Sequence, residues 1–125
     1  MANPNIVNVT TILGNTSTTA LSSTSATAIV SNAAASGKVY KINSIVVANV
    51  DGTNAADITI NLYSQDDIGG TATAIASTIS VPADATLIVT DKTTSFYLLE
   101  DKSVGAVAGT ANDLVVTASW EEINS

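Results

Sequence analysis

Short apolar runs separated by clusters of turn-forming residues are the feature that most limits what this sequence can fold into. Between residues 57 and 64 the side chains alternate strictly, which places Ile58, Ile60 and Leu62 on one face of an extended strand. No segment keeps the apolar period of about 3.6 residues that an amphipathic helix requires. Short strands with turn signals at intervals of roughly 8–12 residues are typical of an antiparallel β-sandwich.

The boundaries of the expected strands follow from the apolar runs. We predict strands over residues 6–13, 28–30, 38–50, 57–64, 75–81, 87–89, 96–99, 104–107 and 114–120. Residues 14–17 (GNTS) read as a turn, and residues 51–54 (DGTN) are expected to close a hairpin. After a change of phase near Asn43, the strand over residues 38–50 is apolar on both faces, which indicates a central strand buried on both sides. Pro82 is expected to end the strand before it.

The first 27 residues differ in composition from the rest of the chain. They hold a Ser/Thr/Ala run with few large apolar side chains, which cannot bury enough surface to order itself alone. We therefore divide the chain into an N-terminal Ser/Thr-rich arm or first strands over residues 1–27 and a sandwich over residues 28–125. The predicted fold is all-β: a single antiparallel β-sandwich, jelly-roll-like or immunoglobulin-like, with an extended N-terminal segment. The missing cysteines exclude an immunoglobulin domain with its Cys…Trp…Cys core.

The charge of the chain argues against two classes of partner. The net charge is −7, there is no arginine, and the cations are Lys38, Lys41, Lys92 and Lys102. Nucleic-acid binding favours clustered cations, and an anionic bilayer repels an acidic protein, so we predict neither nucleic-acid nor membrane binding. We also see neither a signal peptide nor a run of roughly 20 apolar residues that would cross a membrane.

Several kinds of reactive centre are missing from the sequence. The chain has no histidine and no cysteine, which excludes the usual nucleophile–base pairs and zinc ligands. We predict that it is not an enzyme and has no catalytic residue, no cofactor and no metal ligand. The acidic pairs Asp66-Asp67 and Glu100-Asp101 are the two places where a calcium ion is an alternative, but solvated turn acids are the ordinary interpretation.

The aromatic and apolar side chains suggest binding surfaces instead. Tyr63, Tyr97 and Trp120 are candidates for a sugar-stacking surface, although Trp120 alternates in phase with Leu114 and Val116, which favours the core. Tyrosine is enriched at binding hot spots, and the apolar N-terminal run is a candidate anchor. The candidate interface residues are Ile6, Val7, Val9, Ile12, Leu13, Tyr63 and Tyr97.

Four segments carry a resemblance to a known group of proteins. They are residues 38–49 (KVYKINSIVVAN), residues 81–83 (VPA), residues 97–101 (YLLED) and residues 119–123 (SWEEI). In this order they resemble small β-sandwich structural proteins of tailed-phage virions, and the Asn/Thr/Ala-rich style is similar to that of cyanophages. The resemblance covers residues 28–123 and consists of strand-and-turn patterns rather than a catalytic signature.

The resemblance implies a protein that is made in the host cytoplasm and resides in the phage particle. Its implied role is capsid decoration, as a cement protein that binds the major capsid protein or another virion protein through sheet surfaces and an N-terminal arm. The alternative is a tail, neck or fibre module that binds another virion protein or a host surface glycan. A homo-oligomer, by analogy a trimer, is also implied.

Overall fold

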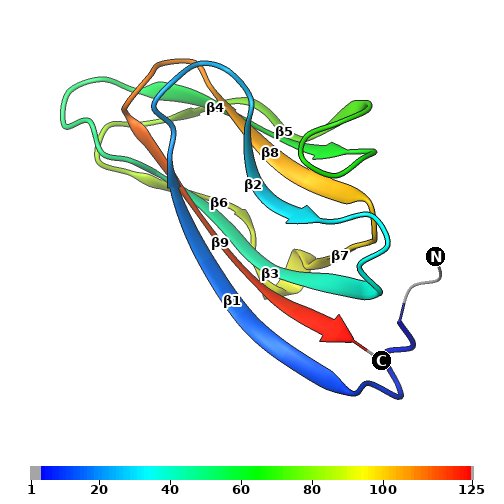
Figure 1. The fold of residues 1–125 in the computed structure, drawn as a ribbon. Coiled ribbons are helices and arrows are strands. Elements are labelled where there is room, and N and C mark those ends of the chain that lie inside the picture. The colour runs from blue at the N-terminus through cyan, green and yellow to red at the C-terminus, as the bar shows by residue number, and fades with distance from the viewer. Residues whose placement is uncertain (1–3, 125) are drawn as a thin grey trace.

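The fold is a sandwich of two antiparallel sheets, seen in a computed structural model that describes residues 4–124 (Figure 1). Residues 1–3 and 125, which the predicted arm and sandwich include, lie outside the described residues. The strands are β1 Thr11–Ala20, β2 Thr27–Asn32, β3 Lys38–Asn49, β4 Ala56–Tyr63, β5 Ala72–Val81, β6 Thr86–Thr90, β7 Phe96–Leu98, β8 Lys102–Ala108 and β9 Leu114–Asn124, with a 3₁₀ turn at Lys92–Thr94. The predicted all-β sandwich is confirmed.

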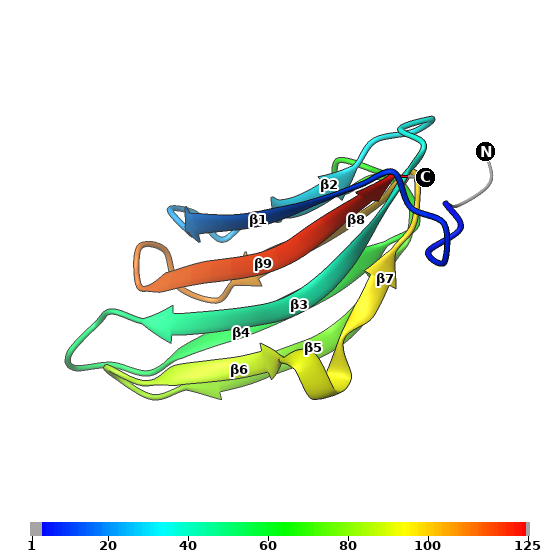
Figure 2. The ribbon, with the colours of Figure 1, turned by 90° about the horizontal axis from the view of Figure 1, so that it is seen from below.

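The two sheets have the strand orders β1-β9-β3-β6 and β2-β8-β4-β5, and β7 pairs with β3 beside β6. Figure 2 shows the first sheet spread in this order in front of the second. Successive strands cross repeatedly between the sheets, which is the arrangement of a jelly roll. The strands at the open edges are therefore β1, β2, β5, β6 and β7, whereas β3, β4, β8 and β9 lie between neighbours.

The core lies between the facing sheets and is built almost wholly from Ile, Val, Leu and Ala. Among its fully buried side chains are Ile42, Ile45, Ile58, Ile60 and Val116. In β3 the register shifts between Ile42 and Ser44, so Ile42 and Ile45 both point inward despite their odd spacing. The predicted change of phase near Asn43 is this bulge.

The first strand lies later in the chain than predicted. Residues 5–8 form a turn, in which the Asn8 amide donates to the Asn5 carbonyl over 3.1 Å, and β1 begins only at Thr11. The predicted turn over residues 14–17 is wrong, because these residues lie inside β1 and pair in unbroken register with β9. Gly14 has no positive φ angle and pairs with Glu121 of β9 as an ordinary strand residue. Pairing with β9 therefore outweighs the local preference for a turn.

The predicted hairpin over residues 51–54 is also wrong. This loop leaves β3 in one sheet and enters β4 in the other. The buried Asn49 holds the crossing: its side-chain amide donates to the carbonyls of Asn54 and Val81, each over 2.9 Å. The second half of β3 buries one face only, since Val46 and Ala48 on the outer face are partly exposed. The last strand is longer than predicted, because β9 continues past Trp120 to Asn124.

Candidate assembly surfaces

Charged residues are missing from every edge strand of both sheets. The strands β1, β2, β5, β6 and β7 contain no Asp, Glu, Lys or Arg. All charges within strands lie on the interior strands instead, at Lys38, Lys41, Asp57, Lys102, Glu121 and Glu122. An edge strand presents unpaired N–H and C=O groups, and monomeric proteins commonly protect it with lysine or proline. These edges lack both, so neither lysine nor proline hinders their pairing with another chain.

The two ten-residue edge strands differ in regularity. β1 pairs with β9 over its whole length without a register shift. β5 has two register shifts against β4, and Thr78 adopts a positive φ of 49° at the bulge, where its amide donates to the Thr59 hydroxyl over 3.0 Å. Bulges blunt an edge by twisting it away from a partner. β1 is therefore the straighter of the two long edges.

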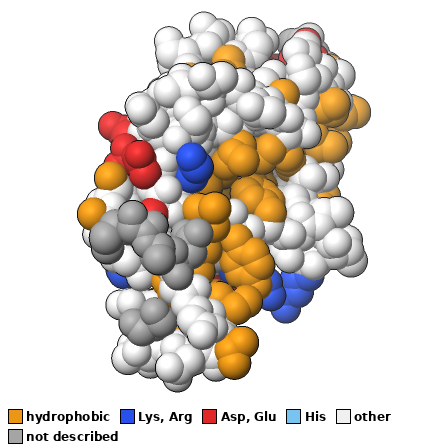
Figure 3. Space-filling view, turned by 90° about the vertical axis from the view of Figure 1, so that its right-hand side faces the viewer, with side chains coloured by type: hydrophobic (Ala, Val, Ile, Leu, Met, Phe, Trp, Pro, Cys, Tyr) orange, Lys and Arg blue, Asp and Glu red, His pale blue; other side chains and the backbone are white. Residues whose placement is uncertain are grey.

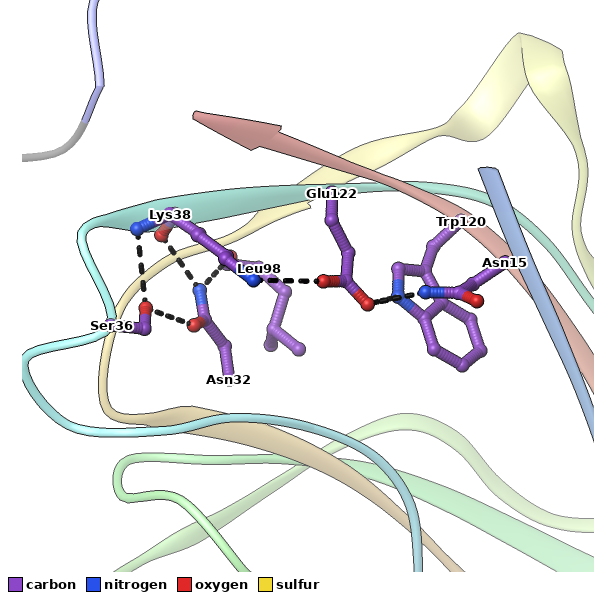
Figure 4. A network of polar contacts seen from close by, with 7 residues as sticks. All are labelled: Asn15, Asn32, Ser36, Lys38, Leu98, Trp120 and Glu122. Carbon is purple, nitrogen blue, oxygen red and sulfur yellow. Dashed lines mark hydrogen bonds and ion pairs between the residues drawn. The ribbon is translucent and has the colours of Figure 1, made fainter. Parts of the chain in front are cut away.

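A polar network fastens β1 and β3 to the middle of the sheet (Figure 4). Its centre is the Glu122 carboxylate on β9, which accepts from Lys38 Nζ on β3 over 3.3 Å and from Asn15 Nδ2 on β1. Trp120 Nε1 donates to the same carboxylate over 3.4 Å. The Trp120 ring packs against the core and stacks on Tyr40, with ring centroids 6.3 Å apart. Burial, and secondarily the Glu122 charge, raise the pKa of Tyr40 above its usual value.

The same figure shows a second anchor beside this network. The buried Asn32 at the end of β2 donates to the carbonyls of Lys38 and Leu98, over 2.9 and 3.1 Å, and accepts from the Ser36 hydroxyl over 2.6 Å. It thereby ties the edge strand β2 to β3 and β7, which belong to the opposite sheet. Both the Nδ2 and the Oδ1 atoms of the buried Asn32 side chain have hydrogen-bond partners, so this residue is a structural anchor.

A shallow apolar groove of about 200 Å³ lies outside the first sheet, where the N-terminal segment forms one of its walls. Pro4 and Ile6 line it from the segment, and Val39, Tyr97 and Leu99 line it from β3, β7 and the following turn. The space-filling view of this end shows an apolar band crossing the surface (Figure 3). Tyr97 is 44% exposed, so the groove presents an aromatic side chain to solvent.

The structure brings some of the predicted interface residues together and separates others. Ile6 and Tyr97 share the groove, and Ile12 lies opposite the buried Ile123 in the β1–β9 ladder. Leu13 lies opposite Glu122, Val7 is 92% exposed in the turn before β1, and Val9 is partly buried. Tyr63 lies on the other sheet and is only 7% exposed. Tyr63, Tyr97 and Trp120 therefore do not form one sugar-stacking surface.

The two acidic pairs meet at the end of the sandwich. The Asp101 carboxylate accepts from the Asp66 amide over 3.1 Å, and the Asp66 carboxylate accepts from the Ala34 amide over 3.2 Å. These carboxylates stabilise turns, as their residue type favours. Within residues 4–124, no three acidic, His or Cys side chains gather as metal ligands do, and no helix is long and apolar enough to cross a membrane.

Two other turn acids are held ionised by their own loops. The Thr53 amide lowers the pKa of Asp51, and the Thr93 hydroxyl and amide lower the pKa of Asp91. Asp91 also closes a capping box with Thr94 at the start of the 3₁₀ turn.

The open edges were not visible in the sequence. A charge-free run such as residues 72–81 is easily found, but its meaning depends on whether the strand lies inside or at the edge of a sheet. That order is set by contacts between distant residues.

Comparison with known proteins supports the fold. No family model matches the sequence, and no curated protein matches it. Among solved structures, the chain is similar to one from a description of Bacillus endospore appendages as a novel family of disulfide-linked pili. The two share 20% sequence identity and a TM-score of 0.55, over 100% of this chain and 96% of that chain. The likeness shows a shared fold.

Proposed function

We propose that this protein is a structural subunit that assembles into a repeated array through the unpaired edges of its sheets. The observation that carries the proposal is the exclusion of charge from all edge strands in a chain with a net charge of −7. Were these residues placed without regard to pairing, some of the 15 charged side chains would be expected on the most exposed strands. An uncharged edge offers main-chain hydrogen bonds to a strand of another subunit.

Two settings for such an array differ in the partner. The sequence resemblance supports a phage particle, where the subunit decorates the capsid by binding the major capsid protein, or serves in a tail, neck or fibre. The likeness to an endospore pilus chain supports a filament built from copies of one subunit. That relative is described as disulfide-linked, whereas this chain has no cysteine, so its copies would be held by non-covalent contacts. Self-association is common to the filament and to the homo-oligomer that the resemblance implies.

The experiment that tests the proposal adds charge to the edges of the purified full chain. Thr18 on β1 and Thr73 on β5 are exposed edge positions, and a Thr18→Lys, Thr73→Lys variant places a cation on each long edge. The matched control, Ser23→Lys with Thr110→Lys, adds the same charge in exposed loops. Light scattering and electron microscopy over a range of concentrations measure assembly.

We expect the edge variant to raise the concentration needed for assembly by about tenfold or more, which corresponds to about 1.4 kcal/mol. The loop control should assemble like the wild type. Equal assembly by both variants would contradict edge pairing. Wild-type chains that stay monomeric alone but bind isolated capsids would exclude the filament and favour decoration.

A further inference from the structure

We propose that the N-terminal arm, defined as residues 4–21, is exchanged between copies, so that β1 of one chain pairs with β9 of a second. The inference rests on the proposed function, because it requires copies to be held close together. The occupant of the β9 edge is thus the same segment that lies there in the single chain. What changes is the copy from which it comes.

The arm touches the rest of the chain, the body, at three separate places. Pro4 and Ile6 line the groove with Tyr97 at one end. Between the ends, the β1–β9 ladder runs without interruption, with Asn15 bonded to Glu122. At the other end Leu21 enters the core, where it is 1% exposed, and its amide donates to the Leu114 carbonyl over 2.9 Å.

The body holds nearly all of the core without help from the arm. Leu21 is the one fully buried side chain between residues 4 and 28, and β1 itself buries none of its side chains fully. The buried residues of the sandwich otherwise come from Ile29 onward. An arm from another copy would meet the same groove, the same ladder and the same cavity for Leu21. Exchange of identical elements loses no contact and requires only that the connecting loop opens.

The connection between arm and body is suited to act as a hinge. Residues 22–26 (SSTSA) are all exposed, and they join β1 in one sheet to β2 in the other. Ser and Thr hydroxyls remain hydrated when such a loop straightens, and none of these side chains belongs to the core.

Charge favours the arm as the bridging element between copies. Residues 4–21 contain no charged side chain, so the net charge of −7 belongs to the rest of the chain. Two bodies repel each other, whereas an uncharged arm approaches an acidic body without that penalty. With the arm seated on the partner, only residues 22–26 cross between the two bodies, and these five residues span roughly 18 Å at most, so the bodies lie side by side.

The test uses the absence of native cysteine. Thr117 on β9 lies opposite Thr18 on β1 and opposite Val46 on β3. Three full-length chains are made, each with one substitution: Thr18→Cys, Thr117→Cys or Val46→Cys. Thr18→Cys and Thr117→Cys chains of different mass are mixed, assembled in reductant, then oxidised and separated without reduction. The control mixture replaces Thr18→Cys by Val46→Cys, whose strand is interior and cannot be exchanged.

We expect the Thr18→Cys and Thr117→Cys mixture to give about tenfold or more mixed disulfide dimer than the control, since exchange holds the two sulfurs at millimolar effective concentration. Equal yields in both mixtures overturn arm exchange, and edge pairing stands if assemblies are still seen by microscopy. Chains that remain monomeric overturn arm exchange, and they also overturn edge pairing if they do not bind isolated capsids. A double variant, Thr18→Cys with Thr117→Cys in one chain, gives a second measurement: it cross-links between chains if arms are exchanged and only within chains if they are not.

Discussion

Strands β1 and β9 are paired residue by residue, yet they are held in the molecule in different ways. β9 alternates buried and partly exposed side chains, with Leu114, Val116 and Ala118 in the core. β1 offers Thr11 through Ala20 almost wholly to solvent, and its apolar Ile12 and Leu13 are more than half exposed. The same ladder thus joins a strand fixed by side-chain burial to a strand fixed mainly by its backbone.

This contrast marks β1 as the strand that can leave the sheet most easily. Burial of apolar side chains is the main favourable term in folding, so a strand that contributes little of it can leave the sheet more easily than one that lines the core. Main-chain hydrogen bonds depend little on side-chain identity, so β9, once β1 has left it, offers its main chain to another extended strand of suitable register.

The largest effect is expected where the arm does enter the core. Leu21→Ala should lower the free energy of unfolding by about 2–5 kcal/mol, because it leaves a cavity among buried side chains. Leu13→Ala, on an exposed position of β1, should change it by less than about 0.5 kcal/mol. Urea denaturation of both variants measures the difference. A loss at Leu13 as large as that at Leu21 would show that β1 is buried against something in the folded protein.

Two glycines offer a contrast of intermediate size. A Cβ at residue 105 on β8 would lie 2.7 Å from Ile68 Cγ2 and 2.8 Å from Tyr63 Cε2, whereas one at residue 14 on β1 would meet nothing within 4 Å. Gly105→Ala should therefore destabilise the fold by about 1–3 kcal/mol. Gly14→Ala should be neutral or stabilising by up to about 1 kcal/mol, since it reduces the freedom of the unfolded chain. Thermal or urea unfolding measures the stability of both variants. A loss of stability in Gly14→Ala as large as that in Gly105→Ala would contradict the open position of Gly14.

The polar network should control how often β1 opens. Asn15→Ala removes the amide that β1 gives to Glu122, and we expect loss of about 0.5–1.5 kcal/mol of protection, or up to roughly tenfold faster hydrogen exchange, in the β1 amides. Asn43→Ala removes a comparable bond, to Glu121 over 3.1 Å, between the interior strands β3 and β9. It should leave β1 exchange unchanged. Faster exchange throughout the sandwich after Asn15→Ala would mean that β1 does not open by itself.

The smallest effect is expected at alkaline pH. The pKa of Tyr40 is raised above 10.0 by burial and by Glu122, so the folded chain holds this proton more tightly than the unfolded chain. The resulting stability is complete below the unfolded pKa and is lost as the pH rises through the raised folded value. Tyr40→Phe keeps the ring beside Trp120 and removes the ionisation. Unfolding followed from about pH 8 to about pH 11 should show the wild type losing more stability than Tyr40→Phe; parallel losses would refute the assignment.

Local patterns predicted most of the strands but not their partners. The apolar runs around Ile29, Ile45 and Leu87 became β2, β3 and β6, and the phase change near Asn43 became a bulge. The turn expected over residues 14–17 failed because a long partner strand outweighs local turn preference. The hairpin expected over residues 51–54 failed because a loop's sequence does not tell whether the next strand stays in the same sheet. The groove of Ile6 and Tyr97 joins residues 91 positions apart in the chain, so no spacing rule would have found it.

The sequence alone determined that this chain is all-β, has a core of small aliphatic side chains, carries a strong negative charge and lacks histidine and cysteine. Those properties follow from residue type and short-range alternation, which act between near neighbours. Strand order in the folded molecule, by contrast, sets which strands stand at the edges and places all the charge within strands on interior ones. Strand order depends on which distant segments bury each other's apolar faces, and it is this order that turned ordinary Thr- and Ala-rich runs into open edges.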